Sequence, residues 1–436
     1  MATEWKRISL RDAGVALIDC DHRTPPAADT GYPYVAIPQL KEGRLSLSTV
    51  RLISPEHFAE WTRKAKPQHH DVILSRRCNP GETAYVPADL ECALGQNLVL
   101  LRAQSKQLFP PFLRWLVRGK DWWGQVGEFI NVGAVFESLR CADIPNFKMP
   151  IPPLVEQKAI AAVLGALDDK IELNRRMNAT LEKMARALFQ SWFVDFDPVR
   201  ARMEGRQPVG LDAATAALFP DSFQDSSLGS IPRGWEVKTI ANVGHVICGK
   251  TPPTSVSDYY GGDVPFITIP DMHGSVFGTV TVRKLSHAGA NSQVKKNLPP
   301  GSLCVSCIAT PGLVVITSEL SQTNQQINSV IPREKEQTYF WYWVLSSLRA
   351  EIASSGSGGS VLSNLSKSRF EALLIINPPC TLIHAYNTTV SALFEKILAN
   401  THQSRTLATL RDALLPKLLS GELSVASLES NIAASV

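Results

Sequence analysis

The chain has 436 residues, of which 44% are hydrophobic and 19% are charged, with a formal net charge of +4. This length predicts two or three globular domains, and the composition excludes an intrinsically disordered chain. No segment approaches the run of about 18 apolar residues that a membrane-spanning helix needs, and the first residues lack the apolar stretch of a secretory signal. We therefore expect a cytoplasmic protein whose eight cysteines are reduced thiols.

The sequence repeats itself once, which indicates an internal duplication. Thr24-Pro25-Pro26 returns as Thr251-Pro252-Pro253, and Pro152-Pro153 returns as Pro378-Pro379. Because the period is far too long for a solenoid, each copy is expected to be a complete domain.

Residues 1–150 are predicted to form the first of these domains. Short apolar runs at Val72–Ser75 and Leu98–Arg102 lie between Gly and Pro turns and indicate strands. Amphipathic spacing predicts helices near Pro55–Lys64 and Pro110–Arg118. The combination is typical of a compact mixed α/β domain.

A long helix is predicted within residues 151–196, after the first Pro-Pro pair. From Glu156 to Phe193, apolar residues recur in alternating steps of three and four, which is the seam of a coiled coil. The seam positions are Ile160, Leu164, Leu167, Ile171, Asn174, Asn178, Leu181, Ala185 and Leu188. A surface helix packed only on its own domain is the alternative interpretation.

A polar connector at 197–230 is predicted to lead into the second domain, at residues 231–379. Its predicted strands and helix are Val264–Ile269, Leu303–Ile308, Leu313–Thr317 and Thr338–Ser354. A second long helix, at 380–420, precedes a tail at 421–436, and Pro416 is expected to kink or end it. Its seam repeats the spacing at Tyr386, Val390, Leu393, Ile397, Asn400, Ser404, Leu407, Arg411 and Leu414.

This order predicts an α+β protein in which two similar mixed α/β domains are joined by two long helices. Because the second helix starts at the second domain, pairing of the helices requires an antiparallel coiled coil with an approximate twofold axis. Polar seam residues near the helix midpoints are expected to fix the register at some cost in stability. These residues are Asn174, Asn178, Asn400 and Ser404.

Motifs for catalysis or metal binding fail on inspection. Gly244–Thr251 fits the phosphate-loop pattern, but Pro252 and Pro253 oppose the helix that must begin there. Asn377-Pro378-Pro379 lacks the aromatic residue of an amino-methyltransferase loop and is better explained as a strand-to-helix junction. Cys304 and Cys307 have metal-ligand spacing without a second ligand pair, so packed strand residues are expected instead. We predict neither an enzyme nor a metal site.

The basic excess lies in the two domains, with 19 Lys/Arg against 16 Asp/Glu in residues 1–150 and 12 against 9 in 231–380. Shared framework residues with divergent polar loops suit the reading of two different short DNA sequences. The candidate DNA-binding residues are Arg23, Thr24, Arg44, Arg76, Arg77, Asn79, Lys250, Thr251, Thr254, Arg283, Lys284, Lys295, Lys296, Ser360 and Lys367.

Three segments resemble the specificity subunit of type I restriction-modification enzymes. Ile151–Asn174, which contains Pro-Pro-Leu-Val-Glu-Gln, resembles the start of that family's first conserved helix, and Ala187–Asp195 its end. Gly229–Trp235 is similar to the start of a second target-recognition domain, whereas Pro378–His384 lacks the Glu-Gln signature. The resemblance covers the whole chain.

The resemblance implies a non-catalytic subunit of a bacterial or archaeal phage-defence system that reads a bipartite double-stranded DNA target. It would recruit two methyltransferase subunits, which bring S-adenosylmethionine and modify adenines, and two restriction subunits, which use ATP and Mg. This chain itself would hold no cofactor. Partner contacts are expected at residues on outward helix faces, namely Glu156, Gln157, Arg175 and Arg176. A methyltransferase that reads its own site and a scaffold without a DNA role are the alternatives.

Overall fold

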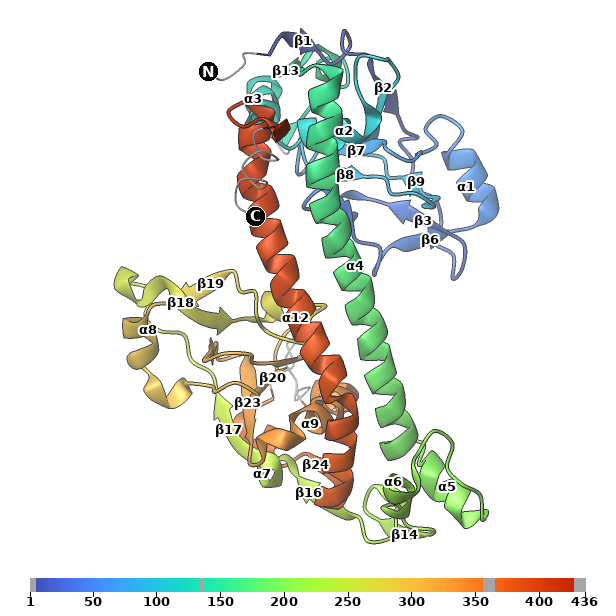
Figure 1. Cartoon of the computed structure of the whole chain (residues 1–436), viewed down its shortest axis with the longest axis vertical. Helices are drawn as coiled ribbons and strands as arrows, with labels where there is room; N and C mark the ends of the chain where they lie inside the picture. Colours follow the sequence, from blue (N-terminus) through green and yellow to red (C-terminus); the bar gives the residue numbers. More distant parts are fainter. Residues whose placement is uncertain (1–4, 133–136, 356–364, 427–436) are drawn as a thin grey trace. The chain divides into compact units, whose positions relative to one another are not determined.

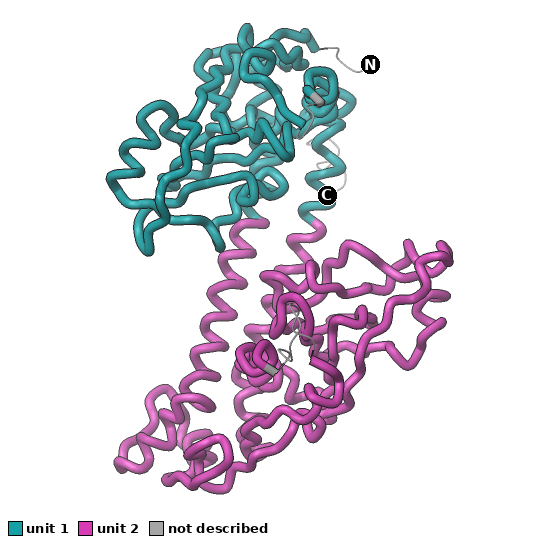
Figure 2. The backbone as a smooth tube through the Cα atoms, turned by 180° about the vertical axis from the view of Figure 1, so that it is seen from behind, with its two compact units in different colours: residues 1–170, 407–436 teal, residues 171–406 magenta. Residues whose placement is uncertain are grey.

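The computed structural model describes residues 5–132, 137–355 and 365–426. It divides into two compact units, which are residues 1–170 with 407–436, and residues 171–406 (Figure 2). The division crosses two long helices, α4 (Leu154–Phe193) and α12 (Cys380–Leu419), so each unit holds one mixed α/β domain and part of each helix (Figure 1). Among the described residues, none of the helices combines the length and apolarity of a membrane span.

The first domain is built on a four-stranded sheet with the order β2-β10-β7-β8, beside a three-stranded sheet with the order β6-β3-β9. Its strands are β1 (Arg7–Ser9), β2 (Val15–Asp19), β3 (Tyr32–Val35), β4 (Leu40–Lys41), β5 (Arg44–Leu45), β6 (Arg51–Ile53), β7 (Val72–Ser75), β8 (Thr83–Tyr85), β9 (Ala93–Leu94), β10 (Leu98–Ala103), β11 (Asn131–Val132), β12 (Glu137–Ser138) and β13 (Lys148–Pro150).

The second domain repeats this topology, with sheet orders β17-β23-β20-β21 and β19-β18-β22. Its strands, with those of the segment before it, are β14 (Phe223–Ser226), β15 (Gly229–Pro232), β16 (Glu236–Thr239), β17 (Gly244–Cys248), β18 (Tyr260–Ile267), β19 (Arg283–Leu285), β20 (Leu303–Ser306), β21 (Val314–Ile316), β22 (Gln322–Thr323), β23 (Ile327–Pro332) and β24 (Leu374–Asn377). The pairs β1-β13 and β16-β24 also correspond, which confirms the internal duplication.

Shorter helices cover the sheets and begin where the sequence supplies start signals. Ser54 caps α1 by accepting a hydrogen bond from the His57 backbone N–H at 3.3 Å, and Pro110 opens α2. The shorter helices are α1 (Pro55–Trp61), α2 (Pro110–Leu116), α3 (Lys120–Phe129), α5 (Asp197–Met203), α6 (Ala213–Ala217), α7 (Ile240–Val243), α8 (His287–Asn291), α9 (Thr338–Ser347), α10 (Arg349–Ser355) and α11 (Lys367–Glu371), with short 3-10 turns at η1 (Ile37–Gln39), η2 (Ile144–Asn146), η3 (Ser257–Tyr259), η4 (Ile269–Met272), η5 (Val294–Lys296) and η6 (Lys335–Gln337).

The segment predicted as a polar connector is folded. It forms α5, α6 and most of the β14-β15 hairpin, and it buries Val199 and Phe219 in the same apolar cluster as Trp192 and Trp235. The sequence pattern did not reveal these buried residues, because single apolar residues in a polar segment produce no helix or strand periodicity.

Each long helix contributes its seam to a domain core, as the spacing of its apolar residues predicts. In unit 1, Ile160, Leu164 and Leu418 pack with Trp115 and Phe147. In unit 2, Tyr386 and Val390 of the predicted seam lie in one cluster with Trp192 and the second domain. Phe189 and Phe394 are buried in the same cluster, whereas the adjacent predicted seam residues Leu188 and Leu393 are only partly buried. Helix α12 continues for one short stretch beyond Pro416 and ends at Leu419.

The helices pair in antiparallel fashion within unit 2. Asn174 Nδ2 donates to Gln403 Oε1 at 2.9 Å and to Ser404 Oγ at 3.2 Å, whereas Asn178, one turn later, meets Ile397 and Thr401. Because later residues of α4 contact earlier residues of α12, the chains run in opposite directions. Asn400 Nδ2 also donates to Asn178 Oδ1 at 2.9 Å, so the predicted polar seam residues do meet.

The junction between domain and helices differs chemically in the two units. In unit 1, Asp168 of α4 is buried among Arg411 of α12, Arg44 and Arg114, at 2.6, 2.8 and 3.6 Å. In unit 2, the position 226 residues after Asp168 is Phe394, which stacks on Tyr339 with ring centroids 4.2 Å apart. One junction is therefore ionic and the other aromatic.

Candidate nucleic-acid interface

The candidate interface of the first domain lies along one edge of its four-stranded sheet. The strands β2 and β7 both pair antiparallel with β10. Asp19 at the end of β2 and Ser75 at the end of β7 therefore lie beside the start of β10, at Leu98 and Val99. The loops that follow or precede these strands therefore meet at this edge, and they carry several of the predicted residues. These are Arg23, Thr24, Arg76, Arg77 and Asn79.

The second domain presents the corresponding edge, because Cys248, Ile327 and Ser306 occupy the same places in its sheet. Gly249 follows β17 and packs against the loop before β23, where an added Cβ would lie 2.1 Å from the Asn324 carbonyl oxygen. Only glycine permits this close approach. It brings Lys250 and Thr251 beside the loop that precedes β23.

Arg23, a candidate DNA-binding residue, forms ion pairs with two acidic side chains. Its Nη2 lies 2.7 Å from Asp21 and 2.8 Å from Glu60, and its guanidinium lies 4.6 Å from the centroid of the Trp61 ring. The hydrogen bond from Arg23 lowers the pKa of Asp21, and the two carboxylates raise the pKa of Arg23. Arg23 is solvent-exposed, yet its charge is compensated. Because its charge is compensated, Arg23 is better suited to form a short, directed hydrogen bond than to attract a distant phosphate group.

A hollow of about 380 Å³ opens beside Thr24. Thr24, Gln39, Arg51, Gln96 and Asn97 contribute polar groups to its wall. Arg51 is fixed by a hydrogen bond from its Nη1 to the Pro25 carbonyl oxygen at 3.0 Å. Concave polar surface at a loop edge suits the insertion of a base edge or sugar.

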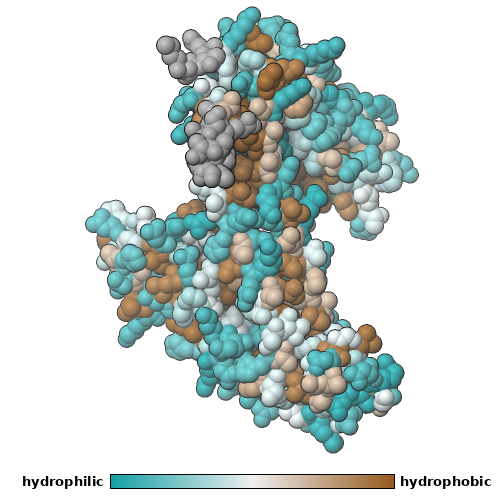
Figure 3. All heavy atoms as spheres, in the orientation of Figure 1, coloured by the Kyte–Doolittle hydropathy of each residue, from teal (hydrophilic) through white to brown (hydrophobic). Residues whose placement is uncertain are grey.

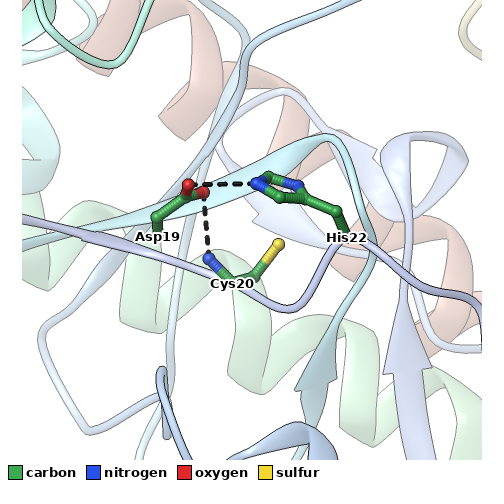
Figure 4. A group of neighbouring side chains, drawn as sticks. All are labelled: Asp19, Cys20 and His22. Carbon is green, nitrogen blue, oxygen red and sulfur yellow. Dashed lines mark hydrogen bonds and ion pairs between the residues drawn. The ribbon is translucent and has the colours of Figure 1, made fainter.

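Asp19, Cys20 and His22 form a cluster at the end of β2 whose possible ligand atoms lie close together, as in a metal site (Figure 4). His22 Nε2 lies 3.0 Å from Asp19 Oδ2, and its Nδ1 lies 2.8 Å from the Gln96 carbonyl oxygen. Both ring nitrogens are thus occupied by protein acceptors. Burial raises the pKa of Cys20 to about 11, and its thiol donates to the Gly95 carbonyl oxygen at 3.2 Å. A protonated thiol and an occupied imidazole do not fit a metal site.

Lysines and amides dominate the edge of the second domain. Thr251 Oγ1 donates to Gln325 Oε1 at 2.8 Å, and Lys296 Nζ donates to the Cys248 carbonyl oxygen at 2.8 Å. Lys250 is exposed, and its carbonyl oxygen accepts from Gln293 Nε2 at 2.7 Å. The hydrogen bonds fix the loop backbone while the Lys250 side chain remains in solvent, which suits a phosphate contact.

Other residues predicted for the second domain lie around this edge or apart from it. Thr254 and Lys295 are exposed, and Lys284 is half-buried on β19. Arg283 is exposed on β19 with its guanidinium 5.6 Å from the centroid of the Phe266 ring. Lys367 forms an ion pair at 3.4 Å with Glu371 on its own helix, α11. Ser360 lies outside the described residues.

Arg44 does not join the other predicted DNA-binding residues. It ion-pairs with Asp168 of α4, and only 19% of its side chain is exposed. In sequence it is one of the polar loop residues that differ between the copies, but its partner lies 124 residues away. Arg76 remains near the edge, where its backbone N–H donates to the Asn97 carbonyl oxygen at 2.9 Å and its Nε is buried.

The prediction that Gln157 lies on an outward helix face was wrong. Gln157 is fully buried and donates from Nε2 to the carbonyl oxygens of Gln107 and Pro152, while its Oε1 accepts from the Phe109 backbone N–H. Its role is to tie the start of α4 to the first domain, because a buried amide must satisfy its polar atoms. Glu156 is half-buried, and Arg175 and Arg176 are exposed.

The motifs that sequence reasoning rejected are also rejected by the structure. Residues 244–248 form strand β17, and the residues after Thr251 do not begin a helix. Cys304 and Cys307 are buried, and burial raises their thiol pKa to about 12 and about 11. Both Pro-Pro pairs lie between a strand and a long helix.

Sequence reasoning missed His22, Gln96, Asn97 and Gln325, which lie at the interface edge in both domains. A signal was present, because an amide pair directly precedes a buried strand in each copy, as Gln96-Asn97 and as Gln325-Gln326. The residues that mark the repeat in the sequence lie elsewhere in the two copies.

A duplicated mixed α/β domain on an antiparallel pair of helices, with different polar residues on equivalent sheet edges, defines a two-domain recognition protein. A family model described as the type I restriction modification DNA specificity domain matches residues 5–183 and 232–383. The chain therefore belongs to the specificity subunits of type I restriction-modification systems.

Individual relatives agree with this assignment. The HindI specificity subunit of Haemophilus influenzae is 36% identical over 397 residues, covering 80% of this chain and 86% of the relative. The MjaIX specificity subunit of Methanocaldococcus jannaschii is 29% identical over 306 residues, covering 69% and 66%. The solved S subunit from M. genitalium has a TM-score of 0.58 at 15% identity, covering 95% of this chain and 96% of that one, and it shares the fold.

Proposed function

We propose that this chain is the non-catalytic DNA-recognition subunit of a type I restriction-modification complex, and that each domain reads one half of a bipartite double-stranded target. The observation that carries this proposal is the pair of equivalent sheet edges. They share a scaffold, yet Asp21, His22 and Arg23 follow one strand where Lys250, Thr251 and Pro252 follow the other. Two domains with the same fold and different residues at the DNA-facing edge are suited to read two different half-sites.

The chemistry of both edges supports DNA contact. Lysine and backbone N–H groups can hold phosphates, whereas Asn, Gln and Arg can distinguish base edges in the major groove. Each domain also carries an excess of three basic residues. The net charge is modest, so partner subunits supply much of the salt-dependent affinity.

The outward faces of the long helices support recruitment of a partner that is present twice. Leu173 and Met184 of α4 are each 51% exposed, and Leu410 of α12 is 45% exposed. Apolar side chains are visible over the middle of α4 in Figure 3. Small or apolar exposed residues recur every seventh position on both helices, at Ala166, Leu173, Thr180 and Ala187, and at Ala392, Ala399, Thr406 and Ala413.

Two similar stripes suit two copies of one methyltransferase subunit, because a seven-residue repeat of small side chains admits a further helix. Restriction subunits then join through the methyltransferase subunits. S-adenosylmethionine, ATP and Mg are assigned to those partners, and this chain is assigned no cofactor.

The test is a comparison of methylated sites. A host strain carrying the methyltransferase gene is sequenced for N6-methyladenine with and without the gene for this chain. We expect a split motif that is methylated only when the chain is present. Methylation at the same sites without the chain, or a complex with no salt-dependent DNA affinity, would contradict the proposal.

A further inference from the structure

We propose that Gln96 and Gln325 are equivalent specificity-determining residues, and that each recognises the major-groove edge of an adenine in its own half-site. The inference rests on the proposed function and deepens it by assigning a base to one position in each domain. It depends on a structural equivalence that the two copies display in detail.

The turns that carry the two glutamines have the same hydrogen-bond pattern. The Leu98 backbone N–H donates to the Gly95 carbonyl oxygen at 2.9 Å, and in the second domain Ile327 donates to Asn324 at 3.2 Å. One residue after each glutamine, a carbonyl oxygen accepts from the strand-end loop, as in Arg76 to Asn97 and Cys307 to Gln326, both at 2.9 Å. Each turn is therefore fixed from both sides, and its glutamine projects from a rigid backbone.

Each glutamine is also contacted by the residue at one equivalent position in the loop after the first strand of the sheet. His22 Nδ1 lies 2.8 Å from the Gln96 carbonyl oxygen, and Thr251 Oγ1 donates to Gln325 Oε1 at 2.8 Å. His22 follows β2 by the same number of residues as Thr251 follows β17. The glutamine is thus common to both domains, while its neighbour differs.

An exposed amide on a fixed backbone turn matches adenine better than the other bases. Both glutamines are exposed. A carboxamide offers one donor and one acceptor, and adenine offers the N7 acceptor and the N6 donor in the major groove. Guanine presents two acceptors there, O6 and N7, so the amide oxygen would face a like group. Thr251 occupies one lone pair of Gln325 Oε1, and the second lone pair can accept from N6.

This pairing predicts that each half-site contains an A·T pair at the place where the glutamine lies. The bases beside it differ between the half-sites, because His22 with Arg23 flanks one glutamine and Thr251 with Lys250 flanks the other. Loss of a bidentate amide contact should reduce discrimination at that base pair by roughly 5-fold to 150-fold.

The experiment uses the complex of this chain with its methyltransferase subunits and a duplex containing the mapped methylation motif. Each adenine of the motif is replaced singly by 7-deazaadenine, which lacks the N7 acceptor, and the dissociation constant is measured at constant salt. For the unmodified chain, we expect about tenfold weaker binding at one adenine in each half-site. Gln96→Ala should abolish this sensitivity in one half-site only, and Gln325→Ala in the other only.

Gln104→Ala provides the matched control, since Gln104 is exposed just beyond the opposite end of β10. Gln96→Glu gives a second readout, because a carboxylate accepts from cytosine N4 and should shift preference at the same position toward C·G. Glutamine variants that keep the unmodified chain's sensitivity at every adenine would overturn the inference. So would relaxation at a G·C pair. If no motif depends on the chain at all, the proposed function fails instead, which is a separate result.

Discussion

Replacement of Asp168 by asparagine should destabilise unit 1 while leaving unit 2 intact. The Asp168 carboxylate is 8% exposed and is paired with Arg411, which is also 8% exposed, and with Arg44 and Arg114. Burial alone would raise the pKa of Asp168, but the three guanidiniums outweigh it and hold the pKa below its usual range. Asparagine preserves the shape and one acceptor but removes the negative charge that contacts all three guanidiniums.

The expected loss is about 3 kcal/mol in the free energy of unfolding of unit 1. Removal of one partner from a buried ion pair costs roughly 3–5 kcal/mol, because the other charge stays buried and uncompensated. Arg411 retains Asp412 as a partner at 2.8 Å, which places the estimate at the lower end of that range. A whole domain is stable by only about 5–15 kcal/mol, so the effect should be readily measured.

Hydrogen exchange read by mass spectrometry resolves the two units separately. Peptides from β7 and β10 should exchange faster in Asp168→Asn, whereas peptides from β20 and β23 should match the unmodified chain. Asp169→Asn is the control, because Asp169 is an exposed neighbour on the same helix. A change below about 0.5 kcal/mol in unit 1, or an equal change in both units, would refute the argument for a local ionic junction.

Three further outcomes follow from the same contacts. The stabilisation from the Asp168 carboxylate should be fully present above its unfolded-state pKa of about 3.9 and be lost as pH falls through its lower folded-state pKa. The free energies of unfolding of the wild-type and Asp168→Asn chains should therefore converge in acid. Asn174→Leu should raise the free energy of unfolding by about 1 kcal/mol in urea titrations, since Asn174 Oδ1 is buried without a hydrogen-bond partner, and a loss of stability would contradict this. Lys250→Ala should reduce the slope of log affinity against log salt by about one, with Lys396→Ala as the control and an unchanged slope as the contrary result.

Periodic features of the fold could be predicted from the sequence because they depend on local spacing. Helix α4 buries the predicted seam positions Ile160, Leu164 and Ile171, since burial on one face of a helix imposes a regular spacing. The strand Val72–Ser75 was identified from its short apolar run, because all four of its residues are buried. The Pro-Pro junctions were also correct, because proline cannot continue either element.

Contacts between distant segments could not be predicted in this way. Gln157 and Arg44 look like surface residues in sequence, but Gln157 is buried and Arg44 is half-buried, through partners that no local pattern specifies. Gln96 and Gln325 could have been found by extending the match of the copies to the strands β10 and β23, since the strand positions correspond in both sheets.

The most direct test of the account is an exchange of the first domain. Residues 1–150 are replaced by the corresponding domain of a relative with a known target, the hybrid is expressed with the methyltransferase subunit, and methylated adenines are mapped across the host genome. The account predicts that one half of the split motif changes to that of the donor while the other half remains the same. A hybrid that alters both halves together, or neither half while still supporting methylation, would contradict it.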